Sequence, residues 1–336
     1  MTFKTQLIAA LLLLLLASAP LGAQTRIPVW IDTDPSVERG GHEVDDGFAL
    51  VQAFHSPELD IRGVSVVFGN APLPTAWPIG KEIVERFGPQ GLRAYRGAAG
   101  SDELGKQTEA SDALTWALEQ GPLHILAIGP VTNVATVLRL HPELAKNVRE
   151  IIAVAGRRSG QHFVVGARQA HPFRDFNFEL DPAAFQVLLD SPVPIVLVPW
   201  EISSKVWMRR ADLERLTRGG PEARYLFEPA SDWLAWWQEN IGVDGFNPFD
   251  TLAVGYLTSP ALIRCRKADA KIAYEPDDTV PAETAKTKPY LLVSFKPARS
   301  HALLYCSKAG SQFKEDLMAR VLNHRKERES HVRETN

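Results

Sequence analysis

The segment Ile27-Pro-Val-Trp-Ile-Asp-Thr-Asp-Pro35 is followed, after the nine residues Ser36 to Val44, by Asp45-Asp46 and a run of residues that reaches Phe54. The apolar residues before Asp32 predict a short buried strand, and the spacing of apolar residues after Asp45-Asp46 predicts a helix. Four aspartates are therefore expected where a strand ends and a helix begins.

Four carboxylates at one strand end repel one another unless a cation binds them. Asp32 and Asp34 are expected to leave one face of the strand, while Asp45 and Asp46 lie at a helix N-terminus, where the backbone dipole favours anions. Because no Cys or paired His lies nearby, these oxygens predict Ca²⁺ or Mg²⁺ rather than zinc. In the alternative, Asp45 only caps the helix and the other pair belongs to a turn, but capping requires one carboxylate and not four.

The composition of the chain limits the class of protein. Its 336 residues, 45% of them hydrophobic, suit one large α/β domain or two smaller ones. The formal net charge of -3 favours neither nucleic acid nor an anionic membrane as a partner.

The two ends of the chain differ in composition from the middle. Lys4, the apolar run Leu7 to Ala19 and small residues up to Ala23 predict a secretory signal peptide over residues 1–23. The run is shorter than the roughly 20 residues that span a bilayer. Export to the periplasm or the medium, without membrane contact after cleavage, is therefore favoured over an uncleaved anchor. Residues 24–323 form the predicted domain, and the charged tail 324–336 is expected to be flexible.

Short apolar runs alternate with amphipathic stretches along the rest of the chain. The predicted strands are Ile61–Phe68, His124–Ile128, Glu150–Ala155, Pro194–Val198, Ala270–Tyr274, Tyr290–Phe295 and Ala302–Tyr305. The predicted helices are Thr132–Leu140, Pro182–Leu189, Ala211–Thr217, Ala223–Asn240 and Asp250–Leu257. This pattern predicts an α/β fold with an open, mostly parallel sheet and helices on both faces. Ligands bind such sheets at the carboxyl ends of the strands, where the aspartates are expected.

The chain has two cysteines, Cys265 and Cys306, and each falls in a segment that resembles a strand. Export would make a disulfide between them chemically possible. The sequence leaves a disulfide and two buried free thiols as open alternatives. Neither alternative gives the cysteines a catalytic role.

Several short blocks occur in a specific order along the chain. They are Ile31-Asp-Thr-Asp-Pro35 with Val44-Asp-Asp46, Val67-Phe-Gly-Asn70, Ile128-Gly-Pro-Val-Thr-Asn133, Phe176-Asn177 and Phe249-Asp250. In this order they resemble the inosine-uridine preferring nucleoside hydrolase family. The resemblance implies a Rossmann-like core and cleavage of the N-glycosidic bond of ribonucleosides, to free base and ribose, with a tightly bound Ca²⁺. It also implies a nucleoside as substrate and a homo-oligomer.

The resemblance implies that Asp34, Asp46 and Asp250 bind Ca²⁺ through their side chains and that Thr132 binds it through its backbone carbonyl. This set agrees with the about six to eight oxygen ligands that Ca²⁺ takes. Asp34 would also accept a proton from the attacking water, because Ca²⁺ acidifies water only weakly. Considered singly, Thr132 and Asp250 also suit a purely structural role as helix caps.

Other residues are implied to contact the substrate or its neighbours. Asp45 and Asn177 resemble the family's ligands of the ribose hydroxyls, and Asn70 resembles its catalytic amide on the ribose side. A negative site suits a transition state whose positive charge grows on the sugar ring. Asp32 resembles a residue that orients its neighbours, and Asn70 also suits an ordinary turn.

Three departures set this chain apart from the family pattern. The family has two residues where Ser36 to Val44 has nine, including His42 and Glu43. Asp175 replaces the usual glutamate and would meet the ribose 5'-hydroxyl differently. Phe249 stands where many relatives carry a histidine that helps to protonate a departing purine.

Without that histidine, the leaving group needs another proton donor or departs with little acid help. We hypothesise that His42 supplies the proton, with His162 and His171 as the next candidates. A solvent-facing histidine without such a role is the alternative for each.

Two further features have two interpretations each. Trp233, Trp236 and Trp237 share one face of a predicted helix and either stack on a nucleobase or pack in the core. Arg157-Arg158 stands where relatives often have a turn of small residues. The pair suits either a solvated basic loop or a contact to an anionic substrate.

Two other functions compete with hydrolysis. An exported nucleoside-binding protein would keep the metal and ribose contacts without turnover, although the presence of Asp34 argues against a complete loss of chemistry. The Asp-x-Asp after a strand also resembles the nucleophile motif of haloacid dehalogenase-type phosphatases. That interpretation leaves Gly129-Pro-Val-Thr-Asn133 and Phe249-Asp250 unexplained.

Overall fold

The computed structural model describes residues 26–37, 43–296 and 301–323. The predicted signal peptide over residues 1–23, the predicted tail over residues 324–336 and His42 lie outside the described residues. In the described part of the chain, no helix has both the length and the apolar character needed to cross a membrane.

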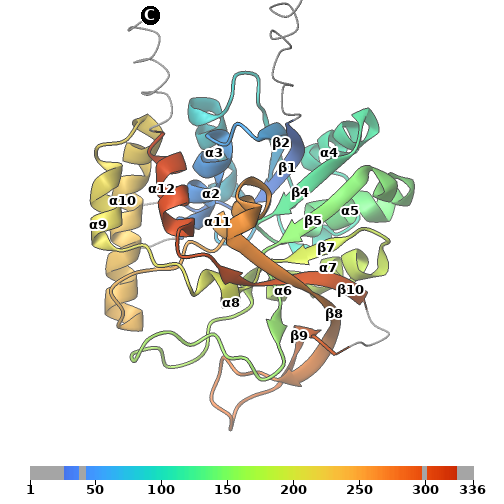
Figure 1. The fold of residues 1–336 in the computed structure, drawn as a ribbon. Helices are drawn as coiled ribbons and strands as arrows, with labels where there is room; N and C mark the ends of the chain where they lie inside the picture. Colours follow the sequence, from blue (N-terminus) through green and yellow to red (C-terminus); the bar gives the residue numbers. More distant parts are fainter. Residues whose placement is uncertain (1–25, 38–42, 297–300, 324–336) are drawn as a thin grey trace, which may run out of the picture.

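Within the described residues, ten strands form one sheet in the order β3-β2-β1-β4-β5-β7-β10-β8-β9-β6 (Figure 1). The strands are β1 (Ile27–Thr33), β2 (Leu59–Val66), β3 (Ala94–Arg96), β4 (Leu123–Ala127), β5 (Val148–Ala153), β6 (Arg157–Arg158), β7 (Ile195–Leu197), β8 (Ile263–Pro276), β9 (Thr287–Ser294) and β10 (His301–Ala309). Neighbours from β3 to β10 run parallel, whereas β8 runs antiparallel to both β10 and β9. The predicted open, mostly parallel sheet is confirmed.

Helices cover both faces of the sheet because successive residues of β1 are apolar. Val29 and Ile31 pack into one core and Trp30 into the other, since successive strand side chains point to opposite faces. The first core includes residues of α2 (Asp45–Phe54), α3 (Leu73–Phe87), α9 (Arg210–Leu216), α10 (Pro221–Trp236), α11 (Thr251–Thr258) and α12 (Phe313–Val321). The second includes residues of α4 (Glu109–Gln120), α5 (Thr132–Leu140) and α7 (Pro182–Asp190).

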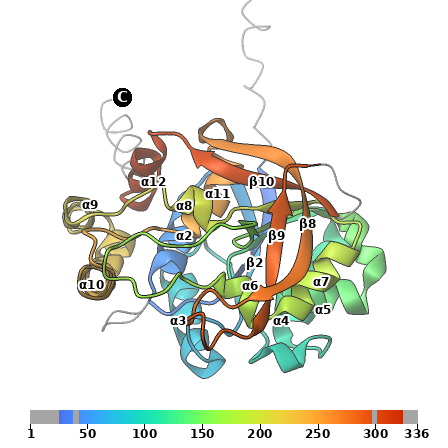
Figure 2. The same cartoon turned by 90° about the horizontal axis from the view of Figure 1, so that it is seen from below.

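The remaining helices are short. They are α6 (Phe176–Leu180), α8 (Trp200–Ser203), the 3₁₀ helices η1 (Ser101–Glu103), η2 (Pro142–Asn147) and η4 (Pro260–Leu262), and the π-helix η3 (Trp237–Ile241). Seen from below, β9 passes beside α6, and β8 passes beside α7 (Figure 2). β9 and β8 therefore lie next to α6 and α7, respectively.

A strand and a helix are among the predicted elements that differ in extent from the observed ones. The strand predicted over Ala270–Tyr274 is part of β8, which begins at Ile263 and pairs with most of β10. Exposed arginine and lysine side chains in the first half of β8 mask the strand in a search for apolar runs. The helix predicted over Ala223–Asn240 is α10 up to Trp236 and then continues as η3.

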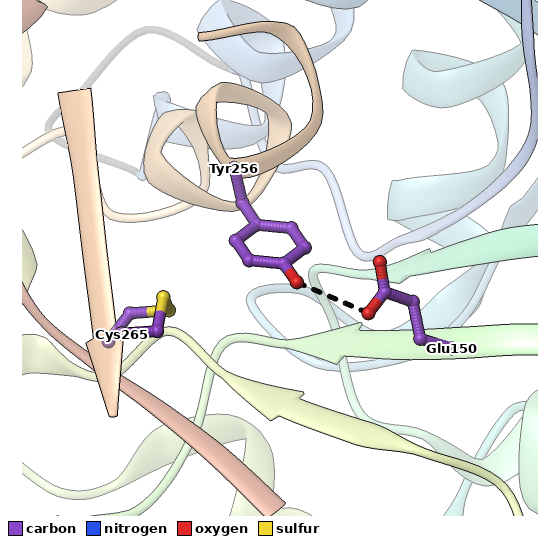
Figure 3. Close-up of a disulfide and its surroundings, with 4 residues drawn as sticks. Glu150, Tyr256 and Cys265 are labelled. Carbon is purple, nitrogen blue, oxygen red and sulfur yellow. Dashed lines mark hydrogen bonds between the residues drawn. A yellow bond between two sulfur atoms is a disulfide. The ribbon is translucent and has the colours of Figure 1, made fainter. Parts of the chain in front are cut away.

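A disulfide joins Cys265 of β8 to Cys306 of β10, which are register partners in that antiparallel pair (Figure 3). The alternative of two free thiols is therefore wrong. In the same region the hydroxyl of Tyr256 in α11 donates a hydrogen bond to Glu150 of β5 at 3.2 Å. The disulfide fixes the register of the two C-terminal strands against each other.

Candidate functional site

The predicted metal and ribose residues meet at the carboxyl end of β1. Asp34 directly follows β1, and Asp45 with Asp46 opens α2. Asp250, which is far away in sequence, directly precedes α11. All four carboxyl groups are buried: Asp34 is 0% exposed and Asp250 is 3% exposed. The fold thus brings distant acidic residues into one buried group.

Asp45, Asp46 and Asp250 each place one carboxylate oxygen within 4.8 Å of the other two, a spacing that could hold a metal ion. The sequence-based metal set contained Asp34 in place of Asp45, so the structure adds Asp45 to the candidates. No side-chain capping bond is made by Val44 before α2 or by Asp250 before α11. Capping therefore does not account for these carboxylates.

Asp34 is held through one of its two carboxylate oxygens. Its Oδ2 accepts a hydrogen bond from the backbone N–H of Asn70 at 2.8 Å, whereas its buried Oδ1 has no partner among the described residues. Gly69 and Gly129 make room for this side chain, because a Cβ at either position would lie 1.9 Å from Oδ2 or 2.7 Å from Oδ1. The open Oδ1 is available to a proton or a cation.

Asp46 is oriented by three hydrogen-bond donors. Its Oδ1 accepts bonds from the hydroxyl of Thr33 and from the backbone N–H of Asp34, the latter at 3.1 Å. Its Oδ2 accepts a bond from Nδ2 of Asn70 at 3.1 Å. Asn70 therefore contacts Asp34 through its backbone and Asp46 through its side chain, which is more than an ordinary turn requires.

Shared burial raises the pKa values in this group. Burial, followed by the charge of Asp45, raises the pKa of Asp46 to about 7. Burial and then the charge of Asp46 raise the pKa of Asp34 well above its usual value, and burial and then Asp45 do the same for Asp250. A divalent cation would offset this repulsion, so the donor set fits a hard metal ion.

Asp32 contacts a different set of residues. Its Oδ1 accepts bonds from the hydroxyl of Ser65 and from Nδ2 of Asn133, the latter at 2.8 Å. Asn133 in turn accepts a bond from the backbone N–H of Ala98 at 2.9 Å. Asp32 therefore fixes the start of α5 against β2, in keeping with the predicted orienting role.

Two further predicted residues lie near the ends of β4 and β5. The hydroxyl of Thr132 donates to Asp181 at 2.6 Å, and Val131 rather than Thr132 occupies the N-cap of α5. A metal contact of Thr132 would thus use its carbonyl oxygen, as the resemblance implies. Asn177 of α6 donates through Nδ2 to the carbonyls of Ile128 at 3.1 Å and Val154 at 3.2 Å, which fixes its side chain.

A cavity of about 610 Å³ opens beside the carboxylates. Its polar lining includes Glu43, Asp45, Asn70, Asp175, Asn177 and Asp250. Its aromatic lining, called the aromatic wall below, comprises Phe163, Phe173, Phe176, Trp200, Trp233, Trp236, Trp237 and Phe249. Polar groups beside aromatic rings suit a ligand that joins a sugar to a planar ring.

The three tryptophans of α10 and η3 combine the two predicted roles. Trp233 and Trp237 are 9% and 1% exposed, and Trp233 stacks on Trp236 with ring centroids 4.7 Å apart. All three also line the cavity. The indole N–H groups of Trp233 and Trp237 are buried without a hydrogen-bond partner in the described part of the chain. These rings therefore belong to the core and also offer a surface for stacking.

Some lining residues were not singled out by sequence reasoning. Glu43 was named only as part of the inserted loop, yet it lies in the cavity, and burial raises its pKa to about 7. Phe163 and Trp200 were not named, although their rings stack with centroids 4.8 Å apart. Only Glu43 could have been predicted to lie near the site, because it lies two residues before Asp45 in the sequence.

The candidate proton donors have different surroundings. The side chain of His162 is 59% exposed and pairs with Asp278 at 3.0 Å. Neither His162 nor His171 is among the described residues that line the cavity, whereas Phe249 does line it. A solvent-facing role fits these two histidines better than proton transfer.

Asp175 and Arg157 lie close to each other in the segment after β5. Oδ2 of Asp175 accepts a bond from the backbone N–H of Gly156 at 2.8 Å, and burial raises the pKa of Asp175 to about 7. Arg157 is 2% exposed and pairs with Asp278 at 2.7 Å, so a solvated loop is the wrong interpretation for this residue. Arg158 is 46% exposed at its side chain, as that interpretation requires.

Known proteins resemble this chain in both sequence and fold. The pyrimidine-specific ribonucleoside hydrolase RihB of Escherichia coli strain K12 is 25% identical over 264 residues, covering 70% of this chain and 80% of that protein. A plant nucleoside hydrolase superposes with a TM-score of 0.72 at 22% identity, covering 89% of this chain and 99% of its own. A purine-preferring ribonucleoside hydrolase from Gardnerella vaginalis gives 0.69 at 16% identity, covering 88% and 98%.

The profile of one protein family also matches most of the chain. It is described as inosine-uridine preferring nucleoside hydrolase, and it matches residues 29–289. The matched range contains all the sequence blocks that converge on the buried carboxylates. The chain therefore belongs to the inosine-uridine preferring nucleoside hydrolase family, and it is a hydrolase that acts on N-glycosyl compounds.

Proposed function

We propose that this chain is an exported, calcium-dependent ribonucleoside hydrolase that releases a free base and ribose. The observation that carries the proposal is the buried group of Asp34, Asp45, Asp46 and Asp250 beside a cavity with an aromatic wall. The carboxylates suit a cation and a sugar, and the aromatic wall suits a planar base.

The candidate ligands are all oxygen atoms, which suit Ca²⁺ or Mg²⁺, and calcium is the proposed ion because the family resemblance implies it. Asp34, Asp46, Asp250 and the carbonyl of Thr132 are the proposed ligands, with Asp45 close enough to share the site. Bound Ca²⁺ would hold and polarise a water molecule beside the sugar and would offset the repulsion within the carboxylate group.

Asp34 is the proposed general base. Its Oδ2 is anchored by the backbone N–H of Asn70, and its Oδ1 is buried without a partner in the described part of the chain. A carboxylate anchored through one oxygen presents the other in a fixed direction, which suits removal of a proton from water as it attacks the anomeric carbon.

The ribose is proposed to lie between the carboxylates and the start of α6. Asp45, Asn70, Asp175 and Asn177 all line the cavity there, and hydrogen bonds fix the side chains of Asn70 and Asn177. Buried carboxylates around the sugar would stabilise the positive charge that develops on the ring as the glycosidic bond breaks.

The base is proposed to pack against the aromatic wall, with Trp233 as a stacking surface. Phe249 lines the cavity and cannot donate a proton, so we retain His42 of the inserted loop as the proposed acid. Replacing His42 by Ala and measuring turnover tests this role. An unchanged rate would remove His42 from the mechanism.

Export is proposed from the composition of residues 1–23. Expression of the full chain in a bacterium, followed by fractionation, should recover the protein in the periplasm or medium with Gln24 at its N-terminus. Recovery in the cytoplasm with Met1 retained would contradict export.

One alternative keeps some support in the structure. A nucleoside-binding protein without turnover is consistent with Phe249 in place of an acid. The phosphatase alternative loses support, because no lysine is among the described residues that line the cavity.

The test is product analysis with the purified mature chain. Uridine, cytidine, inosine and adenosine are each incubated with the protein, with and without chelator, and base and ribose are separated by chromatography. The proposal predicts equal amounts of base and ribose, and no products after chelation. Tight binding without base release would favour the binding protein, and phosphate release from a nucleotide without base release would favour the phosphatase.

A further inference from the structure

One stretch of the cavity lining has no regular secondary structure of its own. The β6–α6 segment, residues 159–175, contains no helix or strand and contributes Phe163, Phe173 and Asp175, among others, to the cavity. At one point it is anchored to η3, because the backbone N–H of Arg168 donates to the carbonyl of Ile241 at 3.1 Å. In Figure 1 this segment reaches from β6 across the molecule towards α10.

Arg157 fastens the other end of this segment. Its guanidinium group donates to both carboxylate oxygens of Asp278, at 2.7 and 3.3 Å, and to the carbonyl of Gln161 at 3.1 Å. Asp278 belongs to the β8–β9 loop, residues 277–286, and the next residue, Thr279, lines the cavity. One buried side chain therefore ties together two loops that are far apart in sequence.

The same guanidinium group lies between two aromatic rings. Its central carbon is 4.9 Å from the ring centroid of Phe163 and 4.4 Å from that of Tyr290. Phe163 stacks on Trp200, and both rings belong to the aromatic wall. Any displacement of Arg157 would thus also move the ring of Phe163, which lines the cavity.

A second cation extends this network to the predicted substrate residue Asp175. Nζ of Lys288 lies 2.9 Å from Glu179, 3.1 Å from Asp277 and 3.7 Å from Asp278. Glu179 in turn accepts a bond from the backbone N–H of Asp175 at 3.0 Å. Removal of one buried partner from such a network leaves an uncompensated charge.

We propose that Arg157 is a positioning residue for the hydrolase reaction. By joining the β6–α6 segment to the β8–β9 loop, it fixes Phe163 and Asp175 and so sets the part of the cavity against which the leaving group packs. Arg157 does not itself line this cavity, so it acts through those two side chains. The inference rests on the proposed ribonucleoside hydrolase function.

Arg157→Met tests this role because it keeps the apolar stem and removes the charge and its hydrogen bonds. The wall contacts the bound base before and during the reaction, so we expect KM for the best nucleoside of the panel to rise about tenfold, with kcat changed by less than about threefold. Calcium affinity, measured by titration, should stay unchanged because the carboxylate group is untouched. Arg157→Lys should recover only part of the loss, since an ammonium cannot replace the planar two-point contact.

The matched control is Arg62→Met, which removes a half-exposed arginine paired with Asp60 on β2. Hydrogen exchange, followed by mass spectrometry, provides a readout that does not need turnover. Residues 161–175 and 277–286 should exchange faster in Arg157→Met and at wild-type rates in Arg62→Met. Asp278→Asn removes the other partner of the same contact, and it provides the same test if Arg157→Met is insoluble.

The outcomes separate the two proposals. A rise in KM with faster exchange of both loops would support the role of Arg157. Unchanged KM and unchanged exchange beside an active wild-type chain would overturn it. A fall in kcat and in calcium affinity to the same extent would also overturn it, since that pattern indicates general misfolding. Absence of base release by the wild-type chain would instead overturn the proposed function, while the exchange data would still report on the loops.

Discussion

The carboxylate group, of which Asp45 and Asp250 line the cavity, and the aromatic wall of the same cavity have different structural supports. Asp34, Asp45, Asp46 and Asp250 lie at the end of β1 and at the starts of α2 and α11, so the regular sheet and its helices place them. Two rings of the aromatic wall, Phe163 and Phe173, come from the β6–α6 segment, where side-chain contacts such as that of Arg157 with Asp278 supply the support.

This difference indicates a division of labour. Residues that must be held to within fractions of an ångström for bond cleavage are placed on rigid elements. Part of the aromatic wall, which is proposed to hold the leaving group, lies on loops, which can change in sequence without disturbing the sheet. We therefore expect changes in the carboxylate group to abolish turnover and changes in the aromatic wall to alter substrate binding.

The largest effect is expected from Asp34→Asn, which keeps the size of the side chain and removes its charge. Loss of a general base lowers turnover by about 10²- to 10⁴-fold, and Asp34 is also a proposed metal ligand, so kcat should fall at least about 10³-fold. Steady-state base release measures this. Asp60→Asn, at a partly exposed carboxylate on β2, is the control and should leave kcat unchanged. A kcat for Asp34→Asn within tenfold of wild type would contradict the expectation that the carboxylate group, and not the aromatic wall, controls turnover.

The next effect concerns the metal-free chain. Burial raises the pKa of Asp46 from 3.8 to about 7, so between these values the folded chain binds more protons than the unfolded chain. This stabilisation is complete below the unfolded pKa and is lost as pH rises through the folded pKa. The melting temperature without metal should therefore fall by about 5 °C between about pH 5.5 and 8. Excess Ca²⁺ should remove most of this pH dependence of the melting temperature. Identical pH profiles of the melting temperature with and without Ca²⁺ would show that Ca²⁺ does not bind these carboxylates.

A smaller effect is expected from Trp236→Ala in the aromatic wall. Trp236 lines the cavity and stacks on Trp233. Loss of this surface should raise KM by about three- to tenfold, with little change in kcat. Trp116→Ala is the matched control, because Trp116 is 62% exposed on α4. A lower kcat at constant KM would show that the wall takes part in bond cleavage rather than in binding.

The smallest effect on catalysis is expected from the double change Cys265→Ser and Cys306→Ser. The cysteines are separated by 41 residues, which corresponds to a loss of roughly 4 kcal/mol of stability when the cross-link is removed. Neither cysteine lines the cavity, so kcat and KM at 25 °C should match wild type. Denaturant unfolding and steady-state kinetics measure the two quantities. A changed KM would place the C-terminal strands in contact with the site.

Much of the fold follows from local patterns of residues. The strand predicted over Ile61–Phe68 appears as β2, Leu59–Val66, because the charged Asp60 interrupts the apolar pattern near its start and the apolar Val67 and Phe68 follow its end. β8 is underestimated because one of its faces is exposed and charged in its first half. The choice between a disulfide and free thiols needed the register of β8 and β10, which no local pattern contains.

In the site too, features that depend on nearby residues were predictable and features that depend on distant residues were not. Asp34, Asp45 and Asp46 lie in one short stretch of sequence, so their shared chemistry was predictable from residue type and spacing. The stacking of Phe163 on Trp200 and the pairing of Arg157 with Asp278 join segments about 40 and 120 residues apart and were not predictable. The sequence therefore left a solvated loop and a contact to an anionic substrate as alternatives for Arg157.

The most direct test of the central claim is a calcium titration of the metal-free chain with its best nucleoside as substrate. We predict no base release without metal and recovery of full activity at one Ca²⁺ per chain, with base and ribose formed in equal amounts. Asp46→Asn should shift the titration to much higher Ca²⁺ concentrations. Full activity of the metal-free chain, with no response to added Ca²⁺, would contradict the assignment of the carboxylate group as the metal site of a nucleoside hydrolase.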